Sequence, residues 1–356
     1  MLVCVTGGTG FVGVHSVAEL VRRGHRVRIL ARDPGTAERG LTALAVDPSA
    51  VGLVAGDVTV ERDVRRAVAG ADAVLHAASV YSFDSRHHAA MRATNARGTE
   101  LVLGAARRAG AARVVHVSSV VALLPAGSGP LHADSPVGRP REAYMASKAA
   151  AERIARRHQA DGAPVLVSYP PALLGPNDPG PGDQNTRLRN TLRGLMPLWP
   201  LGGFPVGDVR DTARLHADLL TTHPIAETPA ANRHFAPGRH LPTRTYLRTL
   251  REVTGRALPA LHLPAAPMLP VGALATAAQR LWPWHIPAEY GAIYTCAHAR
   301  PVTPTASTAG LAPRPTAETM RDTIRWLHDR GLLTARQAGR ALGAHQLDGR
   351  PAVDTR

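Results

Sequence analysis

The 356-residue sequence contains a single lysine, two cysteines and few aromatic residues, and it has no long apolar run. Cys4 and Cys296 lie far apart and offer neither a disulfide framework nor zinc-ligand spacing, which predicts a reducing, cytoplasmic location. Proline and polar residues interrupt the apolar stretch from Pro264 to Trp284, so we interpret it as a helix lining a pocket rather than a membrane span. No charged leader with an apolar stretch opens the chain, so no secretory signal is expected.

Negative charge is also scarce: arginine outnumbers aspartate and glutamate together, and the formal net charge is +15. The basic residues form no continuous run and accompany no known nucleic-acid motif, so we expect no nucleic-acid partner. Much of the charge falls in arginine pairs near the ends of apparent helices, where cations complement the helix dipole. A positively charged chain could still bind anionic small molecules, and that alternative is kept. The pairs are Arg22-Arg23, Arg65-Arg66, Arg107-Arg108 and Arg156-Arg157.

Short apolar runs alternate with helical patterns through the first half of the chain. Runs that are apolar at consecutive positions are typical of strands buried on both faces, and helices between them make a parallel sheet. We therefore predict an α/β fold with a doubly wound parallel sheet. The predicted strands are residues 2–6, 25–31, 51–56, 73–78, 113–119 and 164–169.

A glycine-rich turn follows the first predicted strand and opens the first predicted helix. Glycine lets the backbone turn tightly, lets a pyrophosphate approach, and leaves free N–H groups that face the anion. The strand, turn and helix context makes this a Rossmann-type dinucleotide site rather than a chance glycine cluster. Its predicted cofactor-binding residues are Thr6, Gly7, Gly8, Thr9, Gly10, Phe11, Val12 and Gly13.

Cofactor choice is argued from the end of the second predicted strand, where NAD enzymes place a carboxylate against the ribose. Here Ala31 is followed by Arg32, which can pair with a 2′-phosphate, so NADP(H) is favoured over NAD(H). Arg32 could instead be another surface arginine, and Asp33 could still reach the ribose. Asp57, after the third strand, could accept from the adenine amino group or could simply cap a turn.

The alternation of strands and helices stops after about residue 170, where proline and glycine accumulate. We expect residues 1–169 to form the NAD(P)-binding domain, with 205–235 returning to it. Residues 170–204 and 236–333 would form a smaller α/β substrate-binding domain and lid. The tail, 334–356, has few apolar residues and is expected to be flexible.

Tyr144 and Lys148 lie four residues apart on a predicted helix from about 141 to 158, so their side chains share a face. The helix follows the fifth predicted strand, whose carboxyl end carries Ser118 and Ser119. Ligands of parallel sheets bind at such strand ends. A phenol, an ammonium and a hydroxyl can therefore converge there.

Together these features resemble the extended short-chain dehydrogenase/reductase family, the NAD(P)-dependent epimerase/dehydratase group. The motifs appear in the family's order over about residues 1–330, and the RPTAETMRDTIRWL stretch resembles the family's closing helix. The matching positions are the glycine turn, Asp57, His76 to Ala78, Asn95 in TNARGT, Ser119, the YxxSK motif at Tyr144 to Lys148, and the PxxxxGP stretch at Pro170 to Pro176.

The resemblance implies roles for these residues. Tyr144 would be the acid and base, Ser119 would hold the substrate oxygen, and Lys148 would lower the pKa of Tyr144 and bind the nicotinamide ribose. Asn95 would hold a local helix distortion and a relay water, although a simple structural amide is an equal alternative. Further cofactor contacts would come from Val58, His76, Ala77, Ala78, Tyr169, Pro170 and Pro171.

Two positions depart from the family pattern. Tyr169 stands where the family often has arginine before the first proline, and Leu174 stands where an aromatic residue often precedes the glycine. Contacts made by those two side chains in the family are therefore not expected to carry over.

Reductases resembling dihydroflavonol reductase and 3β-hydroxysteroid dehydrogenase are the favoured branch, because of Arg32, the VRILARDP stretch and an apolar lid at Leu195 to Phe204. A nucleotide-sugar epimerase or dehydratase with tightly bound NAD is the alternative, since Arg187, Arg189 and Arg193 could bind a diphosphate or form a solvated face. A non-catalytic NADP-binding regulator is disfavoured by the Tyr–Lys pair. No feature names the carbonyl or alcohol substrate.

The histidines predict no metal site, because His87, His88 and His216 lack ligand spacing and a suitable partner. The family leads us to expect a homodimer in which the long helix before the fifth strand and the Tyr144 helix pair into a four-helix bundle. Ala149 to Ala151 would permit close packing there.

Overall fold

The computed structural model describes residues 1–80, 88–127, 129–180, 182–278, 290–305, 308 and 311–343. A seven-stranded sheet in the order β10-β6-β5-β4-β1-β2-β3 lies at its centre, and all of its neighbouring strands are parallel. The predicted α/β fold with a parallel sheet is therefore confirmed. The strands are β1 (Leu2–Thr6), β2 (Arg26–Ala31), β3 (Val51–Ala55), β4 (Ala73–His76), β5 (Arg113–Val117), β6 (Val165–Tyr169) and β10 (Arg233–Phe235).

Burial on both faces explains why these strands are apolar at consecutive positions. In β1, Val3 and Val5 pack into one core cluster, whereas Cys4 between them packs into the cluster on the opposite face. All three side chains are fully buried. The sheet is therefore the middle layer of three.

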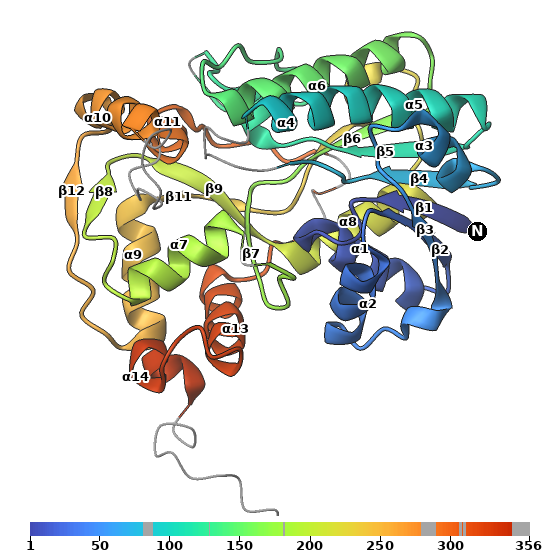
Figure 1. The fold of residues 1–356 in the computed structure, drawn as a ribbon. Helices are drawn as coiled ribbons and strands as arrows, with labels where there is room; N and C mark the ends of the chain where they lie inside the picture. Colours follow the sequence, from blue (N-terminus) through green and yellow to red (C-terminus); the bar gives the residue numbers. More distant parts are fainter. Residues whose placement is uncertain are drawn as a thin grey trace, which may run out of the picture.

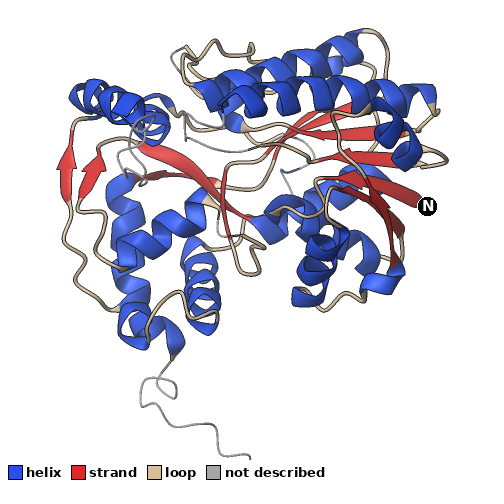
Figure 2. Ribbon diagram, viewed as in Figure 1, coloured by secondary structure: helices blue, strands red, loops and turns tan. Residues whose placement is uncertain are grey.

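Helices cover both faces of the sheet (Figure 2). One core cluster contains residues of α1, α2 and α8, and the other contains residues of α3, α5 and α6. The helices of the two layers are α1 (Phe11–Arg22), α2 (Pro34–Ala43) and α8 (Val209–Thr221) on one face, and α3 (Glu61–Val68), α5 (Gly98–Arg108) and α6 (Ala143–Ala160) on the other.

The chain changes direction across the sheet between β1 and β4. Strands β2 and β3 extend the sheet on one side of β1, and β4, β5, β6 and β10 extend it on the other. The crevice at the carboxyl ends of strands, where the order reverses, is the usual ligand site of an open parallel sheet. The glycine turn at the end of β1 opens at this point.

The second half of the chain forms smaller sheets and a separate group of helices (Figure 1). One sheet has the order β11-β9-β7 and the other pairs β12 with β8. The strands are β7 (Ala172–Leu174), β8 (Leu198–Pro200), β9 (Gly203–Asp208), β11 (Arg239–Pro242) and β12 (Leu261–Leu263). The helices are α7 (Asp183–Leu192), α9 (Thr243–Thr254), α10 (Ala265–Ala278), α11 (Tyr290–His298), α13 (Thr316–Asp329) and α14 (Ala335–Ala338).

The chain returns to the large sheet slightly later than expected. β9 stays in the three-stranded sheet as far as Asp208, and only then does α8 pack against α1 and β10 pair with β6. Asp208 accepts from the backbone N–H of Arg210 at 2.8 Å and so caps α8 at the crossing.

The expectation of a flexible tail from Thr334 is wrong for its first ten residues. Thr334 and Gln337 form a reciprocal capping box at the start of α14, and Ala338, Ala341 and Leu342 are buried. Arg325 on α13 donates to the carbonyl of Ala341 at 2.7 Å. Small side chains suffice here because α9 and α13 provide the large apolar surface, and residues 344–356 lie outside the described part of the chain.

The apolar stretch from Pro264 does form a helix, α10, and its role as a pocket lining stays a prediction. Among the described residues, the cavity described below is lined by Ala292, Thr295 and Cys296 of α11 and by none from α10. α10 packs on the outer side of α11. Within the described residues, no helix is long and apolar enough to cross a membrane. Residues 279–284 of the stretch lie outside the described residues.

Candidate active site

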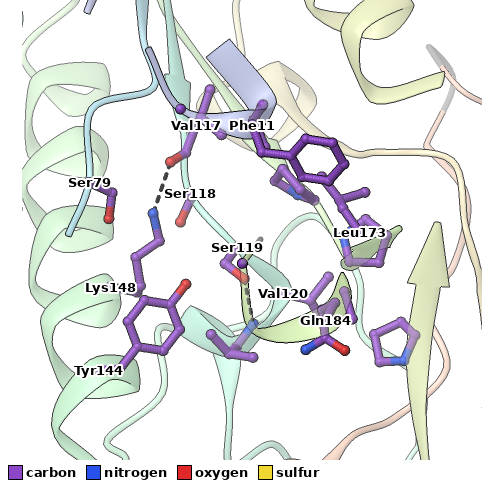
Figure 3. Close-up of a pocket in the computed structure, with 18 of the residues that line it drawn as sticks. Phe11, Ser79, Val117, Ser118, Ser119, Val120, Tyr144, Lys148, Leu173 and Gln184 are labelled. Carbon is purple, nitrogen blue, oxygen red and sulfur yellow. Dashed lines mark hydrogen bonds between the residues drawn. The ribbon is translucent and has the colours of Figure 1, made fainter. Parts of the chain in front are cut away.

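A cavity of about 580 Å³ lies at the carboxyl ends of the large sheet's central strands. Its walls come from the glycine turn, the ends of β4 and β5, helix α6, the segment after β6, and parts of α7, β9 and α11. Figure 3 shows Tyr144 and Lys148 extending from α6 toward the end of β5. The two groups of residues predicted from separate motifs therefore meet in one cavity.

In the glycine turn, backbone segments lie too close together for a side chain. Gly7 has φ +75°, and a Cβ there would lie 2.4 Å from the backbone nitrogen of Ala78. A Cβ on Gly13 would lie 2.1 Å from the carbonyl oxygen of Gly7. Gly10 precedes α1 and supplies no side-chain cap, and the first turn of α1 contains no acid. The exposed N–H groups of α1 therefore fit an anionic pyrophosphate.

Not every residue of the predicted turn faces the cavity. Gly7, Gly10, Phe11, Val12 and Gly13 line it. Thr6, Gly8 and Thr9 do not. Gly8 packs against Ile29, and the Thr6 hydroxyl bonds to Nδ1 of His76 at 2.8 Å, so these two residues support the turn from behind.

His76 lies in the interior rather than at the cavity. Its Nε2 bonds to the Thr99 hydroxyl at 3.0 Å, and its ring stacks on His116 with centroids 5.4 Å apart. Burial, with a smaller contribution from the charge of Lys148, lowers the pKa of His76 to about 3, so the ring is neutral at pH 7. Of the HAA stretch, Ala77 lines the cavity and Ala78 packs against Gly7.

The predicted adenine end lies outside the cavity. Asp57 accepts from the backbone N–H and hydroxyl of Thr59 at 2.8 and 2.7 Å, so its turn-capping role is seen directly. Val58 packs against Gly98 of α5. Arg32 is exposed at the end of β2, and its charge contributes to the lowered pKa of Asp57, although burial opposes that shift and is the largest influence.

Helix α6 starts at a glutamate that the sequence analysis missed. Both carboxylate oxygens of Glu142 accept from the backbone, one from Tyr144 at 3.0 Å and the other from Met145 at 2.8 Å. Glu142 is itself buried. The cap holds the first turn, and therefore Tyr144, in place.

Lys148 is 5% exposed and donates to the carbonyl of Val117 at 3.1 Å, across from α6 to the end of β5 (Figure 3). Burial lowers its pKa to about 8, and the charge of Glu152 one turn later opposes the shift. Lys148 is therefore mainly protonated at pH 7. The Tyr144 side chain is 8% exposed and lines the same cavity.

Ser118 and Ser119 both line the cavity. The Ser119 hydroxyl accepts from the backbone N–H of Val121 at 3.4 Å and caps the short helix Val120–Leu123. The Ser118 hydroxyl is buried and has no hydrogen-bond partner among the described residues. The choice of Ser119 over Ser118 as the substrate contact stays a prediction.

Asn95 lies in a π-helical segment, Ala93–Arg97, between α4 (His88–Arg92) and α5. Its Nδ2 donates to Ser147 Oγ at 2.9 Å, and its Oδ1 accepts from the backbone N–H of Val80 at 2.7 Å. Ser147 in turn donates to the Tyr144 carbonyl. Asn95 does not line the cavity. The structural-amide alternative is therefore seen in its contacts, and its relay role stays a prediction.

The prediction that Tyr169 contacts the cofactor is wrong for its side chain. Tyr169 is fully buried, donates to Glu152 at 2.6 Å and accepts from Arg156 at 3.1 Å. Arg156 also bonds Glu152 at 2.7 Å, so the cluster ties the middle of α6 to β6. Pro170 and Pro171, the next two residues, do line the cavity.

A polar corner of the cavity was not predicted. Asp178 is buried and accepts from the Gly182 N–H at 2.8 Å and from Asn185 Nδ2 at 3.0 Å. Burial raises the pKa of Asp178 to about 6. Gln184 and Arg187 line the cavity beside them. Of the three arginines considered for anion binding, Arg193 is exposed and only Arg187 lines the cavity.

His216, one of the histidines considered as a metal ligand, has a structural role in the interior. His216 is buried between the hydroxyls of Ser16 and Ser168, at 3.0 Å from each. Burial lowers its pKa to about 3. In the described part of the chain, no three histidine, cysteine or acidic side chains gather as a metal site would require. His87 lies outside that part.

Relatives of this chain are named for reductions and oxidations. The "Sterol demethylase protein B" of Methylococcus capsulatus is 28% identical over 339 residues, covering 94% of this chain and 100% of that protein. A Synechocystis protein named as a candidate dihydroflavonol 4-reductase is 31% identical, covering 73% of this chain and 74% of its own length. A 3-beta-hydroxysteroid dehydrogenase of Mycolicibacterium neoaurum is 29% identical over about half of each chain.

Solved structures share the fold. The crystal structure of gox2253 matches with a TM-score of 0.75 at 24% identity, covering 94% of this chain and 99% of that one. UDP-glucose 4-epimerase from Bifidobacterium longum, in complex with NAD+ and UDP, matches with a TM-score of 0.71 at 16% identity. It covers 93% of this chain and 99% of the epimerase. At these identities the likeness concerns the fold alone.

A family model settles the relationship. The model of the NAD dependent epimerase/dehydratase family matches residues 3–223, which include the glycine turn, the Tyr144 helix and the strands between them. The resemblance inferred from the motifs is confirmed by this match and by the reductase and hydroxysteroid dehydrogenase relatives. The chain belongs to the NAD dependent epimerase/dehydratase family, whose members bind a nicotinamide cofactor.

Proposed function

We propose that this protein is an NADP(H)-dependent oxidoreductase that interconverts a ketone or aldehyde and its alcohol on a largely apolar small molecule. One observation carries the proposal: a single cavity joins the glycine turn to Tyr144 and Lys148. When bound, the nicotinamide would supply or accept the hydride.

Tyr144 would donate the proton to the substrate oxygen in the reductive direction. A phenol has an ordinary pKa of about 10, so it needs a nearby cation to release that proton readily near pH 7. Lys148 lies one helical turn away, is buried, and is mainly protonated at that pH. A unit charge at about 4 Å contributes roughly 1 to 4 kcal/mol at dielectrics between those of water and a protein surface.

Two observations support NADP(H) over NAD(H). Arg32 is exposed at the end of β2, where a ribose phosphate would lie. Asp33, the alternative ribose ligand, is already engaged as the cap of α2, accepting from Gly35 N–H at 3.0 Å and from the Thr36 hydroxyl at 2.6 Å. A carboxylate that already accepts hydrogen bonds as a helix cap is less available to a ribose hydroxyl.

The cavity supports an apolar substrate. Apolar side chains from four parts of the chain line it, and few charged groups interrupt them. Pockets for small molecules are typically apolar with a few placed polar groups. The apolar lining comes from Phe11, Val120, Val121, Leu173 and Phe204.

A nucleotide-sugar epimerase or dehydratase is the second candidate. Arg187 and Gln184 line the polar corner of the cavity and could hold a diphosphate or sugar hydroxyls. A non-catalytic regulator would have no use for Tyr144 and Lys148 in the cavity, so we do not favour it.

The test is cofactor turnover with a panel of substrates. NADPH and NADH oxidation would be followed with aldehydes, aryl ketones, steroid ketones and UDP-sugars, and the alcohols would be assayed in reverse. We expect NADPH oxidation with an apolar carbonyl, slowed by about 10² to 10⁴ in Tyr144→Phe. Interconversion of a UDP-sugar without net cofactor turnover would establish the second candidate instead. Cofactor binding without turnover of any member would favour the regulator.

Three further expectations accompany this function. We propose a cytoplasmic location, supported by two buried, unpaired cysteines. We propose a homodimer through α5 and α6, which lie side by side (Figure 1). Ala149 and Ala151 are buried inside the chain, so of that segment only Ala150 is left for the interface. We also propose that the NAD(P)-binding and substrate-binding domains divide near residue 170.

A further inference from the structure

The described chain exposes large apolar side chains mainly at one end. Eight such side chains are exposed, and five of them belong to β8, β12, α10 or the loop before β8. Figure 1 places these elements together at the end opposite the N-terminus. Leu198 and Leu261 are direct partners in the β12–β8 ladder. The five, hereafter the apolar end, are Leu195 (53% exposed), Leu198 (50%), Leu261 (59%), Val271 (60%) and Leu274 (71%).

Helix α10 has an unusual composition for a surface helix. Its sequence, AAPMLPVGALATAA, contains one threonine and no charged residue. A surface helix of a globular protein normally presents polar residues to solvent, and one that is apolar all round is covered by protein or lipid. Leu269 packs inward against the buried cluster that contains Tyr294 of α11, whereas Val271 and Leu274 are exposed. One side of α10 therefore lacks a cover among the described residues.

Arginines border the apolar end. Arg244 and Arg248 are exposed on α9, and Arg193 is exposed after α7. Arg244 is near enough to His262 of β12 to help lower its pKa, although burial has the larger effect. The acidic residue of α9 is Glu252, which lies 4.0 Å from Arg248. An apolar face with a cationic border complements an anionic phospholipid surface.

We propose that the apolar end docks on the surface of an anionic lipid bilayer, with α10 lying in the interface. A second copy of the chain is the competing occupant. Pairing two such ends would bring like-charged arginine borders together, in a chain whose formal net charge is already +15. Interfacial docking requires no spanning helix.

The apolar end adjoins the cavity through α10 and α11. α10 packs on α11, and α11 supplies Ala292 and Thr295 to the cavity wall. Leu269 of α10 packs against the same cluster as Tyr144. If the substrate is apolar, which rests on the proposed function, a docked enzyme would take it from the bilayer close to this wall. The docking itself does not depend on the reaction.

Vesicle sedimentation tests the docking. The full chain would be mixed with phosphatidylcholine vesicles and with vesicles that also contain one quarter phosphatidylglycerol. We expect binding to the anionic vesicles that weakens with salt. Val271→Gln and Leu274→Gln should each weaken it about tenfold, because each change removes an apolar side chain that docking would bury. Val60→Gln and Ile225→Gln, at exposed positions elsewhere, are the matched controls and should bind as the wild type.

The cationic border is tested separately. Arg244→Glu with Arg248→Glu should weaken binding to anionic vesicles at least tenfold, and Arg39→Glu with Arg62→Glu, both on exposed helices elsewhere, should change it by less than twofold. No vesicle binding by the wild type, or equal loss in the control variants, would overturn the proposal. Sedimentation velocity that shows dimers dissociated by Leu274→Gln would assign the face to a second copy. Turnover of a water-soluble carbonyl should be unchanged in all these variants, which separates this test from that of the reaction.

Discussion

The two walls of the cavity are made in different ways. One wall consists of the glycine turn, the end of β5 and α6, and its residues are set by short-range geometry: a helix start, an i and i+4 pair, a strand end. The other wall consists of the segment after β6, α7, β9 and α11, whose residues meet only through long-range packing.

The difference separates two kinds of specificity. Under the proposed function, the first wall would hold the cofactor and the reacting oxygen, which every substrate of this enzyme would share. The second wall is lined by Leu173, Phe204, Ala292 and Arg187, and it would face the part of the substrate that varies. Changes in the first wall should therefore affect every substrate equally, and changes in the second should affect substrates selectively.

Tyr144→Phe is the strongest test of the first wall. The change removes only the hydroxyl, so NADPH affinity should stay while kcat falls by about 10² to 10⁴ with every carbonyl substrate. Steady-state kinetics and a binding titration measure the two effects. Tyr290→Phe, on α11 but outside the cavity lining, is the control and should retain activity. Full activity of Tyr144→Phe would remove the assigned acid.

Gly13→Ala tests the cofactor turn in the same wall. The new methyl would lie 2.1 Å from the Gly7 carbonyl oxygen, so the turn must open. We expect NADPH affinity to fall on the order of a hundredfold, which is about 3 kcal/mol. Gly104→Ala in α5, where a Cβ meets only the end of the Arg108 side chain at 3.3 Å, should leave affinity unchanged. Fluorescence titration that finds equal affinities for both variants would contradict this account of the turn.

The buried Lys148 predicts a pH dependence of stability without cofactor. Its folded pKa of about 8 lies below the ordinary lysine pKa of 10.5, so the unfolded state binds more protons between these pH values. The free energy of unfolding should therefore rise from about pH 8 to 10.5, by on the order of 3 kcal/mol for this group, and its unfavourable effect is complete below pH 8. Urea unfolding of the wild type and of Lys148→Met gives the difference. Parallel curves for the two proteins would show that Lys148 is not desolvated.

Ala292→Phe tests the second wall. A phenyl ring on the cavity face of α11 should raise KM for a bulky substrate on the order of thirtyfold and leave KM for NADPH within twofold, because overpacking costs roughly 1 to 3 kcal/mol. Ala297→Phe, on the same helix but outside the cavity lining, is the matched control. A rise in both KM values for Ala292→Phe would mean that the two walls are not separate in function.

Arg32→Ala should have the smallest effect, since the residue is exposed. We expect KM for NADPH to rise about tenfold and KM for NADH to change little, as a charge-assisted pair with a phosphate contributes roughly 1.5 to 3 kcal/mol. Arg62→Ala, also highly exposed, should change neither. Equal effects of Arg32→Ala on the two cofactors would reopen the choice between them.

The large sheet and the first wall could be predicted because their signals are local. Strands buried on both faces are apolar at consecutive positions, and every predicted strand of the sheet is present within two residues of its expected ends. Tyr144 and Lys148 needed only helical spacing and a nearby strand end to be placed together. The fold class and the family were therefore accessible from residues 1–169.

Other features depended on contacts that no local pattern records. Glu142 was missed because Pro140 and Arg141 already resemble a helix start, and only the structure shows both carboxylate oxygens on the backbone. Asp178 and Asn185 meet across a proline- and glycine-rich loop. Tyr169 was misassigned because its position next to Pro170 does not reveal which face of the sheet its side chain takes. Successive side chains of a strand point to opposite faces.

The lone lysine also makes the protein a convenient object for magnetic resonance. Reductive methylation with isotope-labelled formaldehyde modifies primary amines and leaves guanidinium groups untouched. In this chain it can label only the N-terminal amine and Lys148, once local opening admits the reagent. Every other cationic side chain is arginine, so the spectrum would contain two methylamine signals. One of them would report directly from the cavity.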